Sequence, residues 1–113
     1  MVELGGLVLA LWAMGRHEQA LMTALRGVRR APGELAAHRL ALDCIWRLQG
    51  QGIDLLLRAW ADAIRPGLTI EGAGEFMLER FADATERYHL FVVLSELEHR
   101  RGNHDWAETL FFG

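Results

Sequence analysis

The sequence predicts an all-α protein, a stack of antiparallel helical hairpins with about six helices. Apolar residues recur at steps of three and four, the spacing of one helix face, along most of the 113 residues. Glycine and proline separate these stretches, as they do at helix ends. The two prolines, Pro32 and Pro66, stand 34 residues apart, and each precedes a glycine. That interval is the period of a helix-turn-helix repeat.

The first predicted hairpin covers residues 3–31. Its first helix carries an apolar stripe and ends at Gly15, so a tight glycine turn is expected to follow. Its second helix ends at Arg29 and Arg30, whose positive charges favour a helix C-terminus. The stripe of the first helix consists of Leu4, Leu7, Val8, Leu11 and Trp12.

The second predicted hairpin covers residues 34–66. Its first helix is apolar on two sides, which is expected of an inner helix with neighbours on both of them. The only polar edge of this helix consists of Arg39, Asp43 and Arg47. The second helix follows the bend at Gly50 and Gly52 and ends at Pro66.

The rest of the chain is predicted to depart from the repeat. Residues 67–74 are expected to form a linker with a flexible, glycine-containing turn. No glycine or proline interrupts residues 75–101, which favours one long helix over two helices that meet near residues 86–89. A short last helix, capped by Asn103, completes a long helix plus partial third hairpin over residues 75–112. We expect the whole chain to form a single domain.

The C-terminal end of the sequence is apolar, although a helical stack normally ends in a polar capping element. The apolar side chains at this end either fold back into the core or form a surface for a partner or a second copy of the chain. The residues concerned are Trp106, Leu110, Phe111 and Phe112.

The turn residues resemble those of the tetratricopeptide repeat family, in which a small residue follows the turn glycine by five positions and a proline comes twelve later. The residues that fit are Gly15, Ala20 and Pro32 and, for the first part of the pattern, Gly102 and Ala107. In the second hairpin the glycine comes one residue late. Asp54 or Leu55 stands there at the position of the small residue.

This resemblance implies a right-handed stack whose first helices line a concave groove for a peptide or helix of a partner. It implies a partner-binding set of Leu9, Trp12, Arg39, Asp43, Trp46, Arg47, Val92, Glu96 and His99. In size and architecture the chain also resembles the small repeat-containing chaperones of bacterial secretion systems. The function that this implies is that of an adaptor or chaperone-like subunit that binds another protein.

The charge distribution leaves a second function class open. All twelve basic residues are arginine, and the chain has an excess of two arginines up to Pro66 but an excess of five acids from Gly67 onward. A helical subunit of a nucleic-acid-associated complex would contact phosphates through Arg26, Arg29 and Arg30. The formal net charge of −3 disfavours nucleic acid as the partner, because nucleic-acid-binding domains are usually basic.

No pattern in the sequence predicts an enzyme, a cofactor or a metal site. Two Glu-x-x-His pairs, which end at His89 and His99, resemble metal ligands but do not converge if they share one helix. His99 and His104 flank a glycine turn without a defined third ligand. The lone cysteine, Cys44, lies on an apolar stripe and has no general base beside it in the sequence, and Ser95 lacks a nucleophile motif.

The cellular compartment is expected to be the cytoplasm. With a single cysteine the chain forms no internal disulfide, which suits a reducing environment. Arginines interrupt every apolar stretch before it reaches the length of a membrane span, so no membrane association is expected.

Overall fold

The computed structural model describes residues 4–48, 52–82 and 87–112. This part of the chain forms seven α-helices and no strand, which confirms the predicted all-α class. None of the described helices has both the length and the apolar character needed to cross a bilayer. The helices are α1 (Leu4–Ala13), α2 (His17–Arg30), α3 (Leu35–Arg47), α4 (Ile53–Ile64), α5 (Ile70–Arg80), α6 (Arg87–Arg100) and α7 (His104–Phe112).

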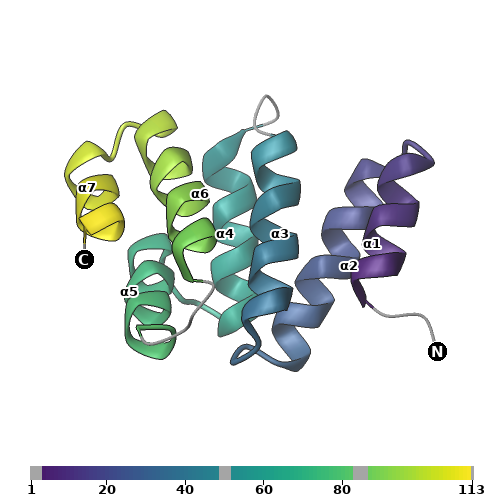
Figure 1. Ribbon diagram of the computed structural model, residues 1–113, viewed down its shortest axis with the longest axis horizontal. Coiled ribbons are helices and arrows are strands. Elements are labelled where there is room, and N and C mark those ends of the chain that lie inside the picture. Colours follow the sequence, from purple (N-terminus) through teal and green to yellow (C-terminus); the bar gives the residue numbers. More distant parts are fainter. Residues whose placement is uncertain (1–3, 49–51, 83–86, 113) are drawn as a thin grey trace.

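Helices α1 to α4 run in alternating directions across the molecule, and α6 and α7 run in opposite directions (Figure 1). The pairs α1–α2, α3–α4 and α6–α7 each lie side by side, and α2 also packs against α3 and α4. Helix α3 has the most neighbours, because it contacts α1, α2, α4 and α6. Helix α5 packs against α4. Helix α3 is therefore the inner helix that its two apolar sides predict.

Two turns of the same construction join α1 to α2 and α6 to α7. Gly15 and Gly102 have φ angles of 78° and 89°, a left-handed conformation that glycine adopts without steric cost. In both turns the amide after the glycine donates to a carbonyl five residues earlier, from Arg16 to Leu11 and from Asn103 to Glu98, at 2.9 Å. The two turns close their helices by the same hydrogen bonds, although 87 residues separate them.

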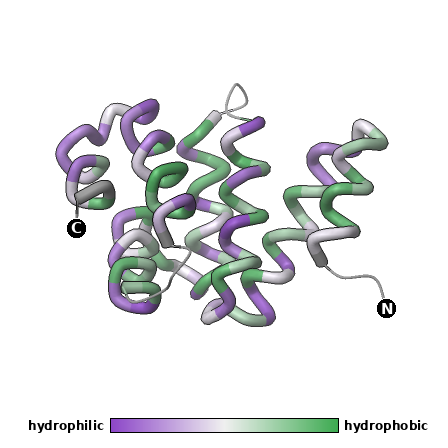
Figure 2. Tube along the Cα trace, in the orientation of Figure 1, coloured by the Kyte–Doolittle hydropathy of each residue, from purple (hydrophilic) through white to green (hydrophobic). Residues whose placement is uncertain are grey.

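Small buried residues follow the two turns. Ala20 and Ala107, each five positions after a turn glycine, are both fully buried. The largest apolar side chains that are fully buried are Trp60, Leu42, Ile45, Leu57, Met77, Leu90, Leu94 and Leu97. Helix α1 contributes less to this core: it carries no strongly hydrophilic residue (Figure 2), but Val8 is its only buried residue among those described.

The prediction of one long helix over residues 75–101 is wrong. Helix α5 ends at Arg80, and α6 begins at Arg87, so the described chain has seven helices where about six were expected. The helix ends at a buried aromatic residue, since Phe81 leaves the helical conformation and packs edge-on against the ring of His38 at 5.5 Å between centroids. Packing against another part of the chain ends α5 here, so neither glycine nor proline is needed.

The predicted linker over residues 67–74 is also wrong in its second half, because α5 begins at Ile70. The hydroxyl of Thr69 accepts a hydrogen bond from the Gly72 amide at 2.9 Å and so caps the helix. Gly67 adopts a φ of 83° in the turn before the helix, whereas the two helical glycines, Gly72 and Gly74, are explained by close packing: a Cβ on Gly72 would lie 2.8 Å from a methyl group of Leu68. The glycine-rich run therefore marks a crowded helix and not a flexible turn.

Among the helical glycines of α5, Gly74 has the closest neighbour, which leads to a prediction for its replacement. A Cβ at this position would lie 2.7 Å from Cζ2 of the Trp106 indole, so Gly74→Ala forces α5 and α7 apart. Overpacking costs about 1–3 kcal/mol, more than the roughly 0.5–1 kcal/mol that alanine gains over glycine in a helix. We expect a lower urea midpoint and altered tryptophan fluorescence.

Gly5→Ala is the matched control, because a Cβ on this helical glycine meets only Leu40 at an ordinary 3.9 Å. This variant is expected to be as stable as the unmodified protein or more so. Equal midpoints for the two variants would contradict the close approach of α5 and α7.

Candidate partner-binding face

The outward side of α3 supplies the centre of the candidate site. Asp43, Trp46 and Arg47 follow one another at helical spacing and are at least partly exposed, as is Arg39 one turn earlier. The opposite side of the same helix carries residues such as Ile45, which is fully buried. Helix α3 lies between α1 and α6, and it contacts both of them. Its exposed side is thus bordered by two further helices.

On the α1 side, a cation–π contact joins α1 to α3. The guanidinium carbon of Arg47 lies 5.2 Å from the centroid of the Trp12 ring system. The imidazole of His17, just beyond the Gly15 turn, stacks on Trp12 at 4.1 Å between centroids and 20° between planes. Trp12 is therefore held between α2 and α3 and remains partly exposed.

On the α6 side, two contacts reach α3. The guanidinium carbon of Arg100 lies 4.7 Å from the centroid of Trp46. His89, three turns earlier on α6, places Nε2 3.3 Å from Oδ1 of Asp43. We call the surface that these contacts define the α1–α3–α6 face, and its residues are Trp12, Asp43, Trp46, Arg47, His89 and Arg100.

The structure brings together four of the nine residues that the sequence predicted for partner binding, namely Trp12, Asp43, Trp46 and Arg47. Of the others, Leu9 is 59% exposed, Arg39 and Glu96 are exposed, and Val92 is half-buried. His99 takes part in a different contact: its Nδ1 lies 2.9 Å from Nδ1 of His104 on α7, so one nitrogen donates and the other accepts.

Sequence reasoning missed His17, His89 and Arg100. A signal for the last two was present, because His89, Glu96 and Arg100 stand seven and four residues apart and thus lie on one helix side. Glu96 was assigned to the face, so its helical neighbours belonged there as well. Their contacts with Asp43 and Trp46 required knowledge that α6 packs against α3.

The other predicted surfaces divide into buried and exposed parts. Leu110 is 2% exposed, and Trp106 packs partly buried against Gly74, so these two residues fold back into the protein. The side chains of Phe111 and Phe112 lie outside the described part. The alternative phosphate-binding set, Arg26, Arg29 and Arg30, is exposed on the last turns of α2.

The titratable residues considered for chemistry are placed as follows. Glu86 of the first Glu-x-x-His pair lies outside the described residues. Across residues 4–48, 52–82 and 87–112, no three His, Cys, Asp or Glu side chains gather as a metal site would require. Ser95 is buried, and its hydroxyl donates to the carbonyl of Ala107 at 2.8 Å. This hydroxyl ties α6 to α7.

Cys44 is 4% exposed, and burial raises the pKa of its thiol to about 11, against a smaller opposing effect of Arg47. About 0.1% of such a thiol is ionised at pH 8, compared with roughly a quarter of an ordinary cysteine. We therefore expect an aromatic disulfide reagent to modify the folded protein at least a hundredfold more slowly than the urea-unfolded chain. Comparable rates in the two states would contradict the burial of Cys44.

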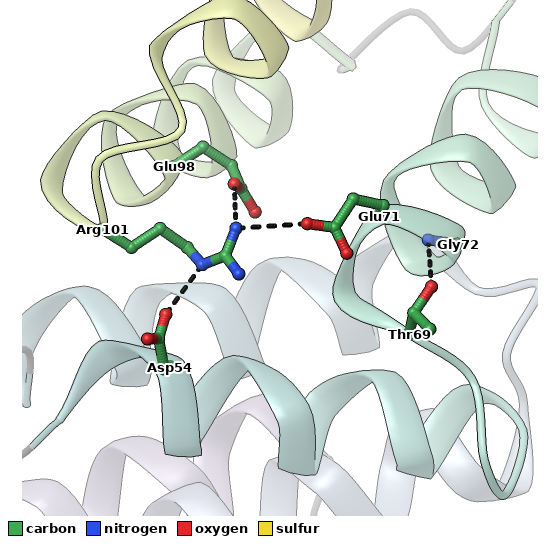
Figure 3. Close-up of polar contacts among 6 residues, drawn as sticks. All are labelled: Asp54, Thr69, Glu71, Gly72, Glu98 and Arg101. Atoms are coloured by element: carbon green, nitrogen blue, oxygen red, sulfur yellow. Dashed lines mark hydrogen bonds and ion pairs between the residues drawn. The ribbon is translucent and has the colours of Figure 1, made fainter.

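An ion-pair cluster that includes one buried carboxylate, Glu98, lies on another side of α6 (Figure 3). Arg101 donates from Nε to Asp54 of α4 at 2.8 Å and from Nη1 to Glu98 at 2.8 Å, and Nη1 lies 3.5 Å from Glu71 of α5. Glu98 is fully buried, and this burial raises the pKa of its carboxyl, although Arg101 acts in the opposite direction. The cluster fixes α6 against α4 and α5.

His38, a buried residue of α3, forms a second polar contact in the core. Its Nδ1 accepts a hydrogen bond from Nε1 of Trp60 at 3.0 Å, so its Nε2 is the donor to the carbonyl of Pro32 at 2.6 Å. Burial lowers the pKa of this imidazole, against an opposing effect of the Pro32 hydrogen bond. His38 is therefore a neutral residue that joins α3, α4 and the α2–α3 connection.

Comparisons of the chain with protein-family models, with curated proteins and with solved structures give no match. Its function is therefore inferred from the face itself.

Proposed function

We propose that the chain is a protein-interaction module, an adaptor or chaperone-like subunit, that holds a peptide or helix of a partner against the α1–α3–α6 face. One observation carries this proposal: two partly exposed tryptophans from different helices, Trp12 and Trp46, each lie under a guanidinium on one side of the molecule. Tryptophan and arginine are the residue types that contribute most often to the binding energy of protein interfaces.

The contacts also make this surface suited to binding because they restrict its side chains before a partner arrives. Trp12 is stacked by His17 and contacted by Arg47, and Trp46 is contacted by Arg100. Side chains that are already restricted lose less conformational entropy on association, which favours affinity. A flexible surface of the same composition would bind more weakly.

The hairpin arrangement supports a stack similar to that of tetratricopeptide repeats as part of this proposal. The equivalent turns at Gly15 and Gly102, and the buried alanines that follow them, are what such a stack requires. In it α1, α3 and α6 are the first helices of the three hairpins, and the partner lies along these helices.

The proposal is tested by affinity capture from the native host, with mass spectrometry to identify the bound protein. We expect Arg47→Glu to remove the specific partner, because it places a carboxylate where a guanidinium contacts Trp12. Trp46→Ala is expected to have the same effect. Circular dichroism must show unchanged helicity for both variants.

Arg58→Glu, an identical charge change at an exposed position of α4, is the control and should leave capture unchanged. Unchanged capture by folded Arg47→Glu and Trp46→Ala would show that the partner binds elsewhere. A purified complex with nucleic acid, lost on substitution of Arg26, Arg29 and Arg30, would support the other function class.

A further inference from the structure

We infer that the segment held on the α1–α3–α6 face is acidic, and that two of its carboxylates bind the guanidinium groups of Arg47 and Arg100. This inference rests on the proposed function and specifies the chemistry of the partner. Its basis is the state of these two arginines: each lies over a tryptophan ring, and within the described part of the chain neither forms an ion pair.

Stacking occupies the flat side of a guanidinium and leaves its N–H donors available at the edge. Arg47 lies over Trp12 and Arg100 lies over Trp46, at 5.2 and 4.7 Å from the ring centroids. The planar guanidinium presents five N–H donors in a fixed fork that matches the two oxygens of a carboxylate. Each stack thus orients a fork for an anion from outside.

The carboxylates of the described residues do not pair with these two guanidinium groups. Among the described residues, neither Arg47 nor Arg100 forms an ion pair. The adjacent Arg101, by contrast, contacts three carboxylates of α4, α5 and α6. The two consecutive arginines therefore differ: Arg101 is paired with acids, and no described acid is paired with Arg100.

The acids nearest to the face in sequence do not change this conclusion. Asp43 contacts His89 at 3.3 Å. Glu96 stands one turn before Arg100 on α6 and is exposed, yet it is not paired with Arg100. Residues up to Pro66, which supply α1 and α3, carry an excess of two arginines over acids, whereas the part that supplies α6 carries an excess of five acids, so the attraction for an acidic segment is local to the two guanidinium groups.

The two guanidinium groups lie beside the same helix. Trp46, which carries the Arg100 stack, and Arg47 are consecutive residues of α3, so the two guanidinium groups flank this one helix. Helices that pack together lie about 8–10 Å apart, so one short segment laid along α3 can reach both. The expected ligand therefore has two acidic residues on one side, at a fixed spacing.

The experiment is a selection of random 15-residue peptides displayed on phage, performed on the full chain. It is repeated with Arg47→Gln/Arg100→Gln and with the control Arg58→Gln/Arg65→Gln, whose arginines are exposed on or after α4. The best peptides are then synthesised with their acids and with the matching amides, and their dissociation constants are measured by fluorescence anisotropy.

We expect peptides enriched in two acids at a constant spacing. Amide replacement in the peptide, or Arg47→Gln/Arg100→Gln in the protein, should weaken binding at least about tenfold, because each removes charge-assisted hydrogen bonds. The control should stay within about twofold. Thermal unfolding midpoints of both double variants must match the unmodified protein, so that lost binding is not lost folding.

Several results would overturn the inference. Selected peptides without acidic enrichment, or acidic peptides that bind Arg47→Gln/Arg100→Gln equally well, would leave the proposed function standing but refute the acidic ligand. Concentration-dependent dimerisation that requires Arg47 and Arg100 would assign the face to a second copy of this chain. No selected peptide above background, together with binding to an oligonucleotide, would reject both proposals.

Discussion

Arg101→Ala is expected to lower the free energy of unfolding by about 3–5 kcal/mol, because it leaves the Glu98 carboxylate buried without its cationic partner. The ion pairs with Asp54 and Glu71 contribute little to this loss, since those side chains are 59% and 53% exposed and water screens them. The measurement is urea unfolding followed by circular dichroism at pH 7.5.

Arg100→Ala is the matched control, since it removes the neighbouring arginine but only an exposed cation–π contact of about 0.5–1 kcal/mol. A second variant, Arg101→Met/Glu98→Leu, removes both charges and should recover most of the lost stability. If Arg101→Ala were no less stable than Arg100→Ala, the buried pair would not hold α6 in place.

The loss in Arg101→Ala should also grow with pH. Burial raises the folded-state pKa of Glu98 above its ordinary value of 4.5, so the folded protein binds this proton more tightly than the unfolded chain does. Stability contributed by this group is therefore present at low pH and falls as the pH rises through the folded-state pKa. Removal of Arg101 raises that pKa further. The difference in the free energy of unfolding between the unmodified protein and Arg101→Ala is therefore larger at pH 8 than at pH 5.

His38→Ala is expected to be similarly severe, at about 3–5 kcal/mol. It removes the acceptor of the Trp60 indole and the donor to the Pro32 carbonyl, and it leaves a cavity in the core. His104→Ala, at an exposed position, should change the free energy of unfolding by less than about 1 kcal/mol. Equal midpoints for the two variants would contradict the buried position of His38.

The pH dependence of the His38 contribution has the opposite sign to that of Glu98. Burial lowers the folded-state pKa of His38 below 6.5, so the unfolded chain binds this proton first as the pH falls. Stability is therefore complete above pH 6.5 and decreases below it, by at most about 1.4 kcal/mol per pH unit. His38→Gln should lack this decrease. The same pH slope in both proteins would show that His38 is not buried in its neutral form.

Much of the fold is predictable from local patterns in the sequence. Helices α1 to α4 have apolar stripes and end near glycine or proline, so both their existence and their order follow from residues close in the chain. The break between α5 and α6 does not, because it depends on Phe81 packing against His38, which is 43 residues earlier. Gly74 was misleading for the same reason: its neighbour Trp106 is distant in sequence.

The candidate site was predictable only where it lies on one helix. The spacing of Asp43, Trp46 and Arg47 places them on one side of α3 whatever surrounds it. Their contacts with Arg100 and His89 depend on the packing of α6 on α3. Glu98 and His38 could not be recognised as buried, because charged and polar residues are usually found at the surface.

The consecutive arginines Arg100 and Arg101, at the end of α6, have different roles. Arg101 anchors the helix to α4 and α5, while Arg100 extends over Trp46 on another side. These contacts restrict the motion of the last turn of α6, so less conformational entropy would be lost when a partner binds Arg100. If the proposed partner binds this face, weakening the pair between Arg101 and the buried Glu98 carboxylate should speed its dissociation even where every surface residue is intact.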